Sequence, residues 1–172
     1  MAIAAFETCN DGLQAFSRRR DHFVHTPDLA DDRLWVPYAE GVWFQPCQVN
    51  ASAGGFAVLL KALPGAKLGK HYHVGAVQGY TLQGTWRYLE HDWVATKGMF
   101  IFEPPGEAHT LVIPEDAKEP MLAFFVVSGG LVYVDEAGGF LAYEDGFSLL
   151  KLVREHYRQV GIDASRVDAL IR

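Results

Sequence analysis

The chain has 172 residues, of which 49% are hydrophobic, 13% are aromatic and 21% are charged, and its formal net charge is −6. This length suits one domain with a substantial apolar core, and this composition excludes an intrinsically disordered chain. The acidic balance argues against a nucleic-acid partner, because the only basic cluster is Arg18, Arg19 and Arg20 beside Asp21.

The N-terminus carries no recognisable export signal. Residues 1–6 are apolar, but Glu7 and Asp11 follow before the run reaches the length of a signal-peptide core, and no stretch of 18 apolar residues occurs later. Cys9 and Cys47 form neither a CxxC motif nor a disulfide framework. We therefore expect a cytoplasmic protein without a membrane partner.

Residues 1–33 are polar and weakly periodic, and they predict an N-terminal arm that lies across a neighbouring subunit or on the surface of a monomer. From Leu34 onward, short apolar and aromatic runs recur about every ten residues, with Gly, Pro and Asp between them. This pattern indicates a β-sandwich or barrel over residues 34–143. The runs are 34–36, 41–44, 56–63, 79–82, 85–89, 100–102, 111–113, 121–127 and 131–134.

The last part of the chain changes its periodicity. Gly138-Gly139 lies between two apolar runs and predicts a β-hairpin, because glycines tolerate the positive φ of such turns. Apolar residues then recur at spacings of three and four over residues 145–160, which predicts a helix that stops at Gly161. A last short helix is expected over residues 165–171. Residues 144–172 thus form a helical tail on a single β domain.

Two histidines, His71 and His73, are separated by one residue. On a strand their side chains point to the same face, so both can reach one ion. The spacing alone also suits a pair of surface or hydrogen-bonded histidines. With a third histidine, His109, the arrangement suggests a metal site.

Together these segments resemble the two signature motifs of the cupin superfamily. The matching positions are, in order, Gly65, His71, His73, Gly84, Gly98, Pro104, Gly106 and His109. The resemblance implies an all-β cupin fold, a small jelly-roll barrel or double-stranded β-helix, with the three histidines as metal ligands. It also implies a homodimer or homotetramer.

The chain departs from the cupin pattern where a glutamate ligand usually follows the second histidine. Val77 and Gln78 occupy those places, although Gln78 can bind through its carbonyl or hold a water. A site of three neutral imidazoles leaves the double charge of the ion without an anionic ligand, so we expect an anionic chelating guest. Fe(II), Zn(II), Ni(II) and Mn(II) all suit imidazole ligands.

The stretches over residues 84–93 and 95–111 resemble a narrower group, the 2,4'-dihydroxyacetophenone dioxygenase family, and more distantly acetylacetone dioxygenase. This resemblance implies non-haem Fe(II) held by His71, His73 and His109. It further implies a small hydroxyketone or diketone substrate, dioxygen as the second substrate, and cleavage of a carbon–carbon bond. By the same resemblance, Glu103 is expected to orient a ligand histidine.

Other side chains are weaker candidates for the site. Arg87 can bind a substrate carboxylate or pair with Glu103, or it can be an exposed strand arginine. Strand parity places Arg87 opposite Trp86 and Tyr88, so these three cannot all face the same pocket. Two alternative functions stay open: a Zn or Ni cupin that acts as a hydrolase or isomerase, and a non-catalytic cupin that senses a ligand or metal.

Overall fold

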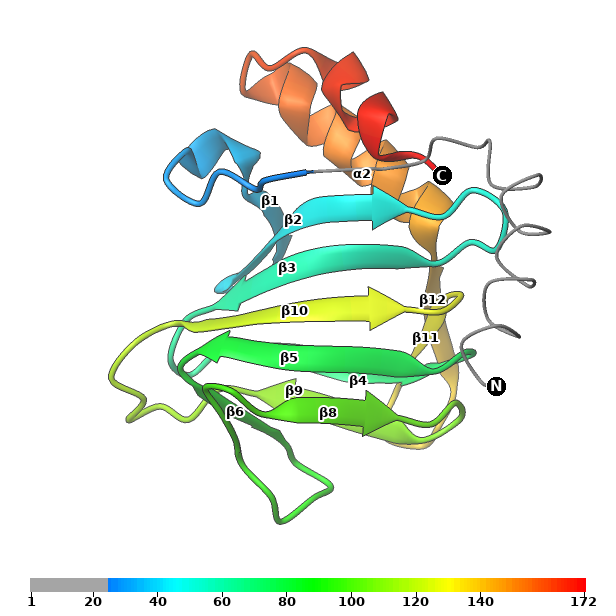
Figure 1. Cartoon of the computed structure of the whole chain (residues 1–172). Helices are drawn as coiled ribbons and strands as arrows, with labels where there is room; N and C mark the ends of the chain where they lie inside the picture. Colours follow the sequence, from blue (N-terminus) through cyan, green and yellow to red (C-terminus); the bar gives the residue numbers. More distant parts are fainter. Residues whose placement is uncertain (1–24) are drawn as a thin grey trace, which may run out of the picture.

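Two antiparallel sheets of six strands each face one another in the computed structural model, which describes residues 25–172 (Figure 1). The first sheet has the order β1 (Val36–Ala39), β2 (Val42–Val49), β3 (Phe56–Ala62), β10 (Met121–Val127), β5 (Val77–Gln83) and β8 (Phe100–Glu103). The second has the order β12 (Phe140–Glu144), β11 (Leu131–Val134), β4 (Lys67–His73), β9 (Ala108–Val112), β6 (Thr85–Tyr88) and β7 (Ala95–Thr96). This architecture confirms the predicted all-β jelly roll.

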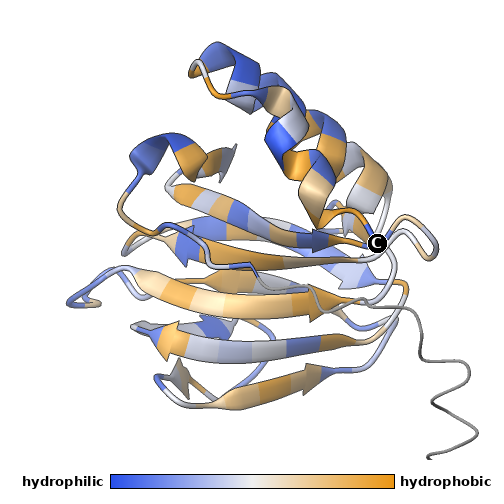
Figure 2. Ribbon diagram, turned by 45° about the horizontal axis from the view of Figure 1, so that its top comes forward, coloured by the Kyte–Doolittle hydropathy of each residue, from blue (hydrophilic) through white to orange (hydrophobic). Residues whose placement is uncertain are grey.

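The core forms where the alternate side chains of both sheets meet. In β10, Met121, Ala123, Phe125 and Val127 are buried, and the residues between them are only partly covered. This alternation is what a half-buried strand requires. Hydrophobic residues accordingly follow the strands, whereas the helical tail carries both hydrophilic and hydrophobic residues (Figure 2).

A helical tail packs at the β1 and β2 end of the sandwich, as predicted (Figure 1). Helix α2 (Gly146–Gln159) starts at Asp145, whose side chain accepts hydrogen bonds from the amides of Phe147 and Ser148. Such an N-cap satisfies amides that have no partner within the helix. The last short helix is a 3₁₀ segment, η2 (Ala164–Leu170). No helix among residues 25–172 is both long and apolar enough to span a bilayer.

Three details of the predicted elements differ from the structure. A 3₁₀ turn, η1 (Asp32–Leu34), replaces the start of the first predicted strand, because Asp31 caps the amide of Arg33. β2 continues through Pro46 to Val49, since a shift in register there accommodates the proline. The short β7 was not predicted. Residues 1–24 of the expected arm lie outside the described residues, and the division into 1–33, 34–143 and 144–172 stays a prediction.

Two turns depend on glycine, and the first of them was predicted. Gly138 has a φ of +86° in the hairpin between β11 and β12, which confirms that turn. Gly75 follows the histidine strand β4 at a point where the backbone approaches another turn closely. A Cβ atom on Gly75 would lie only 1.6 Å from the carbonyl oxygen of Ser128.

We expect Gly75→Ala to lower the free energy of unfolding by about 1–3 kcal/mol or more, because the added methyl group overlaps backbone that cannot rotate away. Urea denaturation of both proteins measures this difference. Gly69→Ala is the matched control, since a Cβ atom at Gly69 meets nothing closer than the Tyr133 ring at 3.8 Å. Equal loss of stability in the two variants would contradict the prediction.

Candidate metal centre

Three histidines from adjacent strands meet inside the sandwich. His71 and His73 project from β4 to the interior, and the antiparallel register between β4 and β9 makes His109 the direct partner of His71. Directly paired residues present their side chains to the same face of a sheet. The ring centroids lie 4.9 Å (His71 to His109), 5.0 Å (His71 to His73) and 5.4 Å (His73 to His109) apart. One ligand nitrogen from each residue lies within 4.8 Å of the other two.

The three imidazoles are neutral in this environment. Burial lowers the pKa of His73 and that of His109 to about 3, with the neighbouring histidines adding to the shift, and it also lowers the pKa of His71. Neutral imidazole is the form that binds metal ions. The Nδ1 atom of His71 lies 2.7 Å from the carbonyl oxygen of Gly69, so Nδ1–H donates and Nε2 keeps its lone pair.

A carboxylate lies next to the histidine nitrogens. Glu103 ends β8 and is 4% exposed. Its Oε2 atom lies 3.3 Å from Nε2 of His73 and 3.4 Å from Nε2 of His109. Burial raises the pKa of Glu103 to about 7, against the opposing effect of the Tyr88 hydroxyl, which donates to Oε1 at 2.6 Å. Since both histidines are neutral, these contacts are not ion pairs.

The unpaired atoms at this point fit a divalent ion. The described side chains contain buried polar atoms without a hydrogen-bond partner at His73, Glu103 and His109. Two of these, Oε2 of Glu103 and Nε2 of His109, face each other, and such groups cost free energy unless something binds them. Imidazole nitrogens with one carboxylate form a ligand set that suits first-row divalent metals. The cluster is thus a three-histidine metal site.

The register explains how a carboxylate reaches the site although none follows His73 in sequence. Val77 on β5 pairs with Glu103 on β8. The carboxylate missing from position 77 therefore comes from its partner on the neighbouring strand. This places Glu103 close to two ligand histidines, as the expected orienting role requires.

The other expected site residues lie elsewhere. Gln78 is exposed on the outer face of β5, because its neighbour Val77 points inward. It does not reach the histidines, which corrects the expectation that its carbonyl can bind the ion. Arg87 is only partly buried and faces away from Trp86 and Tyr88, and it is not among the described partners of Glu103.

Tyr88, a candidate pocket residue, and Glu90, which had no signal in the sequence, both support the site. The Tyr88 ring stacks on His109, with centroids 3.9 Å apart and an angle of 11° between the planes. The Glu90 carboxylate accepts hydrogen bonds from the Thr110 amide and hydroxyl at 2.8 and 2.9 Å, which fixes β9 next to His109. Both contacts depend on the pairing of β6 with β9, which joins segments that are distant in the sequence.

A small apolar cavity of about 50 Å³ lies beside the metal centre. Its wall includes Phe44, Leu60, Phe125, His71, His73 and Glu103. Tyr38 also lines the cavity, and its hydroxyl contacts both the Tyr133 hydroxyl, at 2.8 Å, and the Glu144 carboxylate. Burial raises the pKa of both tyrosines, so they are protonated at neutral pH. Most of the cavity wall is thus apolar or uncharged.

Comparisons with known proteins agree with this geometry. A family model described as a ChrR cupin-like domain matches residues 21–135. An RmlC-like cupin protein from Ralstonia eutropha is 30% identical, with a TM-score of 0.71 over 81% of this chain and 91% of that one. An acetylacetone dioxygenase from Acinetobacter johnsonii is 16% identical, with a TM-score of 0.68 over 80% and 96% of the two chains.

A third similar structure is the Rhodobacter sphaeroides complex of SigE with the anti-sigma ChrR. It is 17% identical, with a TM-score of 0.50 over 68% of this chain and 65% of that one. At identities of 16% and 17%, the dioxygenase and the complex show likeness of fold alone. Curated proteins contain no match to the sequence.

Proposed function

The chain belongs to the family of ChrR cupin-like domains, and from that premise we propose that it is a non-haem iron dioxygenase that cleaves a carbon–carbon bond of a small hydroxyketone or diketone. In the hydroxyketone case, the bond between the carbonyl carbon and the hydroxylated carbon breaks. Both atoms of dioxygen enter the products, which are two carboxylic acids.

One observation carries the proposal: three neutral imidazoles and a buried carboxylate converge at the edge of a mostly apolar cavity. His71, His73 and His109 would hold the ion on one side and leave positions open to a substrate, as catalytic rather than structural sites do. A bound Fe(II) ion would supply a Lewis acid for the ketone oxygens and a redox partner for dioxygen. The apolar wall excludes water from these groups.

Glu103 lies where it can accept a proton from the substrate. A hydroxyketone or diketone must lose a proton to become an anionic chelating ligand. The Oε2 atom of Glu103 has no hydrogen-bond partner and lies at the centre, so it can accept that proton, while Tyr88 holds the carboxylate in place through Oε1. The family resemblance of residues 84–111 to 2,4'-dihydroxyacetophenone dioxygenases supports the same substrate class.

Oxygen uptake tests the proposal. Protein prepared with Fe(II) under anaerobic conditions is expected to consume one dioxygen per molecule of ketone. It should release two acids from 2,4'-dihydroxyacetophenone, and one acid and a 2-oxoaldehyde from pentane-2,4-dione. Metal-free protein and His109→Ala are expected to show no uptake, because the ion is lost. A purified protein that holds zinc at full occupancy and draws no oxygen with either ketone contradicts the dioxygenase and favours a hydrolase, an isomerase or a sensor.

A second candidate, a non-catalytic sensing cupin, is favoured by the matching family model and by the similarity to the anti-sigma ChrR. The metal centre suits this role as well, because a sensor also needs a specific ligand or metal site. The two proposals differ in turnover: a sensor binds its ligand without consuming oxygen.

A further inference from the structure

A second cavity, of about 270 Å³, opens where the edges of the two sheets meet. One side is β8, which is the last strand of the first sheet among residues 25–172. The other side is the segment that follows β6 in the second sheet. We call this cavity the seam pocket; it is lined by Tyr88, His91, Trp93, Met99, Phe100, Ile101, Phe102, Glu103, Pro104, Glu107 and His109.

The seam pocket shares lining residues with the metal centre. Tyr88 and Glu103 line both the seam pocket and the inner cavity, and the ligand His109 also lines the seam pocket. These three side chains are at most 4% exposed, and Tyr88 and Glu103 lie between the two spaces. A molecule in the seam pocket therefore lies next to Glu103, whose carboxylate contacts two ligand histidines.

The two cavities differ in volume and therefore in the ligands that they can hold. An engineered protein cavity of about 150 Å³ is large enough for a benzene molecule. The inner cavity, at about 50 Å³, is much smaller and has room for dioxygen or a few waters. The seam pocket, at about 270 Å³, accommodates an aromatic ring with a short substituent.

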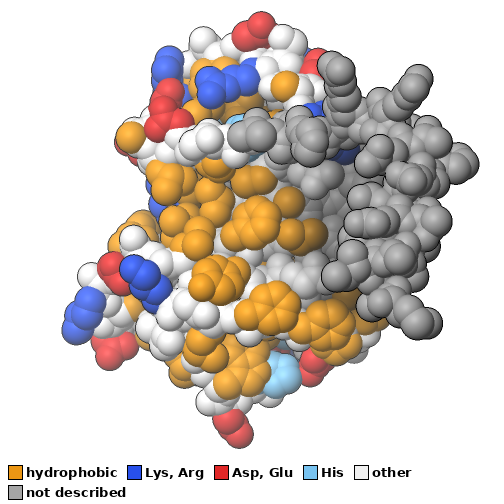
Figure 3. Space-filling view, viewed as in Figure 1, with side chains coloured by type: hydrophobic (Ala, Val, Ile, Leu, Met, Phe, Trp, Pro, Cys, Tyr) orange, Lys and Arg blue, Asp and Glu red, His pale blue; other side chains and the backbone are white. Residues whose placement is uncertain are grey.

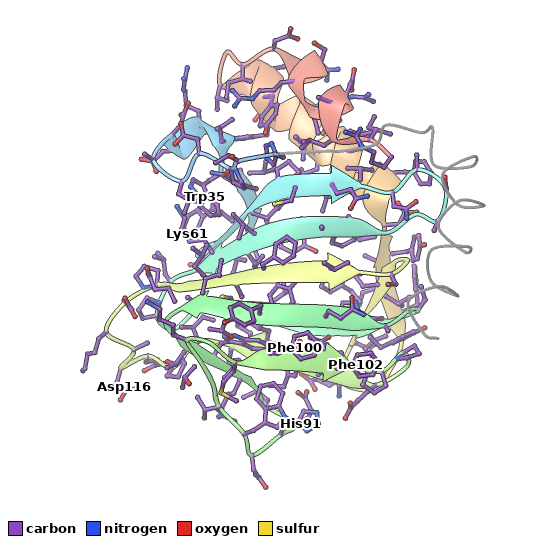
Figure 4. All side chains as sticks on the ribbon, in the orientation of Figure 1. Trp35, Lys61, His91, Phe100, Phe102 and Asp116 are labelled. Atoms are coloured by element: carbon purple, nitrogen blue, oxygen red, sulfur yellow. The ribbon has the colours of Figure 1, made fainter. Side chains whose placement is uncertain are left out.

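The walls of the seam pocket suit a flat, apolar group. The His91 and Trp93 rings stack with centroids 5.6 Å apart, and Trp93 meets Tyr88 edge to face at 5.4 Å. Phe100 and Phe102 project from β8 on the outer side and are 63% and 57% exposed (Figure 4). Hydrophobic side chains also gather over β10, β5 and β8 on this face (Figure 3). Aromatic walls of this kind hold rings by stacking and edge contacts.

The charges at the rim select against anions. Glu107 lies at the rim and pairs with His91 at 3.1 Å, and Glu103 forms the floor. No Lys or Arg lines the pocket among the described residues. A carboxylate on the ligand would thus meet two acidic side chains and no guanidinium or ammonium partner, which is unfavourable.

We propose that the seam pocket binds the uncharged aromatic ring of an organic ligand and directs its polar end toward Glu103 and His109. This inference rests on the proposed function for its choice of an aryl ketone as the ligand. The inner cavity then remains open for dioxygen.

Binding of acetophenone, a neutral aryl ketone, tests this inference without turnover. We expect titration of ¹⁵N-labelled, Zn(II)-loaded full chain to shift the amide signals of Trp93, Ile101 and Phe102 in a saturable way. Phe102→Ala should raise the Kd about tenfold, because a wall of the pocket is lost. Phe140→Ala is the matched control: its ring is 69% exposed on β12 in the other sheet, and we expect no change in Kd.

In the metal-free protein, benzoate, the anionic analogue, is expected to bind at least about tenfold more weakly than acetophenone because of the acidic rim. Shifts confined to Leu60, Phe125 and Leu131 would place the ring in the inner cavity and overturn the inference, as would the absence of saturable shifts. If the amide signals of the seam pocket shift but the Fe(II) protein takes up no oxygen, the dioxygenase proposal is wrong and the seam pocket is still a binding site. If the protein takes up oxygen but these signals do not shift, the dioxygenase proposal holds and the seam pocket is not the binding site.

Discussion

His73→Ala is expected to weaken metal binding by more than about 100-fold, the upper end of the loss caused by removing an outer partner of a metal ligand. The side chain is buried, and its ring lies 5.0 Å from His71 and 5.4 Å from His109 between centroids. Its removal leaves only two of the three imidazole ligands. Competition with a chromogenic chelator measures the affinity, and the rise in Tm on adding Zn(II) should disappear.

The control for this variant is His156→Ala. His156 lies on α2, where it bonds the carbonyl oxygen of Arg33, and it takes no part in the cluster. We expect metal affinity to be unchanged there. If metal-free His73→Ala remains folded by circular dichroism and still binds Zn(II) with the original affinity, the three-histidine centre is refuted.

Glu103→Gln is expected to lower metal affinity and kcat by about 10–100-fold each, as losses of supporting groups at metal sites do. Glutamine keeps the shape and can still accept the hydrogen bond from Tyr88, but it removes the negative charge next to His73 and His109. The same change removes the group proposed to accept the substrate's proton. Metal titration and oxygen uptake measured at saturating metal separate the two effects.

Glu115→Gln is a matched control, because Glu115 is an exposed glutamate away from the centre. We expect it to leave both quantities unchanged. A merely structural role for Glu103 would lower the Tm of the metal-free protein without changing metal affinity at a temperature where the variant is folded. That result would contradict the role proposed here.

The three histidines can be recognised in the amino-acid sequence because their signal is local. Side chains two apart on a strand share a face, so His71 and His73 are expected to act together. The glycine and proline positions around His109 add the third ligand by resemblance. The structure confirms the cluster, and the direct pairing of His71 with His109 gives its geometric cause.

The orientation of the Gln78 and Arg87 side chains could not be predicted from the sequence in the same way. Alternation tells which residues of a strand share a face, but it does not tell which face is inside. On β5 the inner face belongs to Val77, and on β6 it belongs to Trp86 and Tyr88. Packing against the opposite sheet determines which face of each strand is buried. As a result, Gln78 and Arg87 point away from the metal centre.

Period and turn residues are local properties, so the sequence by itself determined the β architecture and the helical tail. It indicated the three histidines of the cluster through their resemblance to the cupin motifs. Only the tertiary structure decided which carboxylate joins them and where a ring can bind. Glu103 reaches the centre because β8 pairs with β5, and the seam pocket exists because β8 and the segment after β6 meet at the sheet edges. Both depend on contacts between distant segments, which no local pattern encodes.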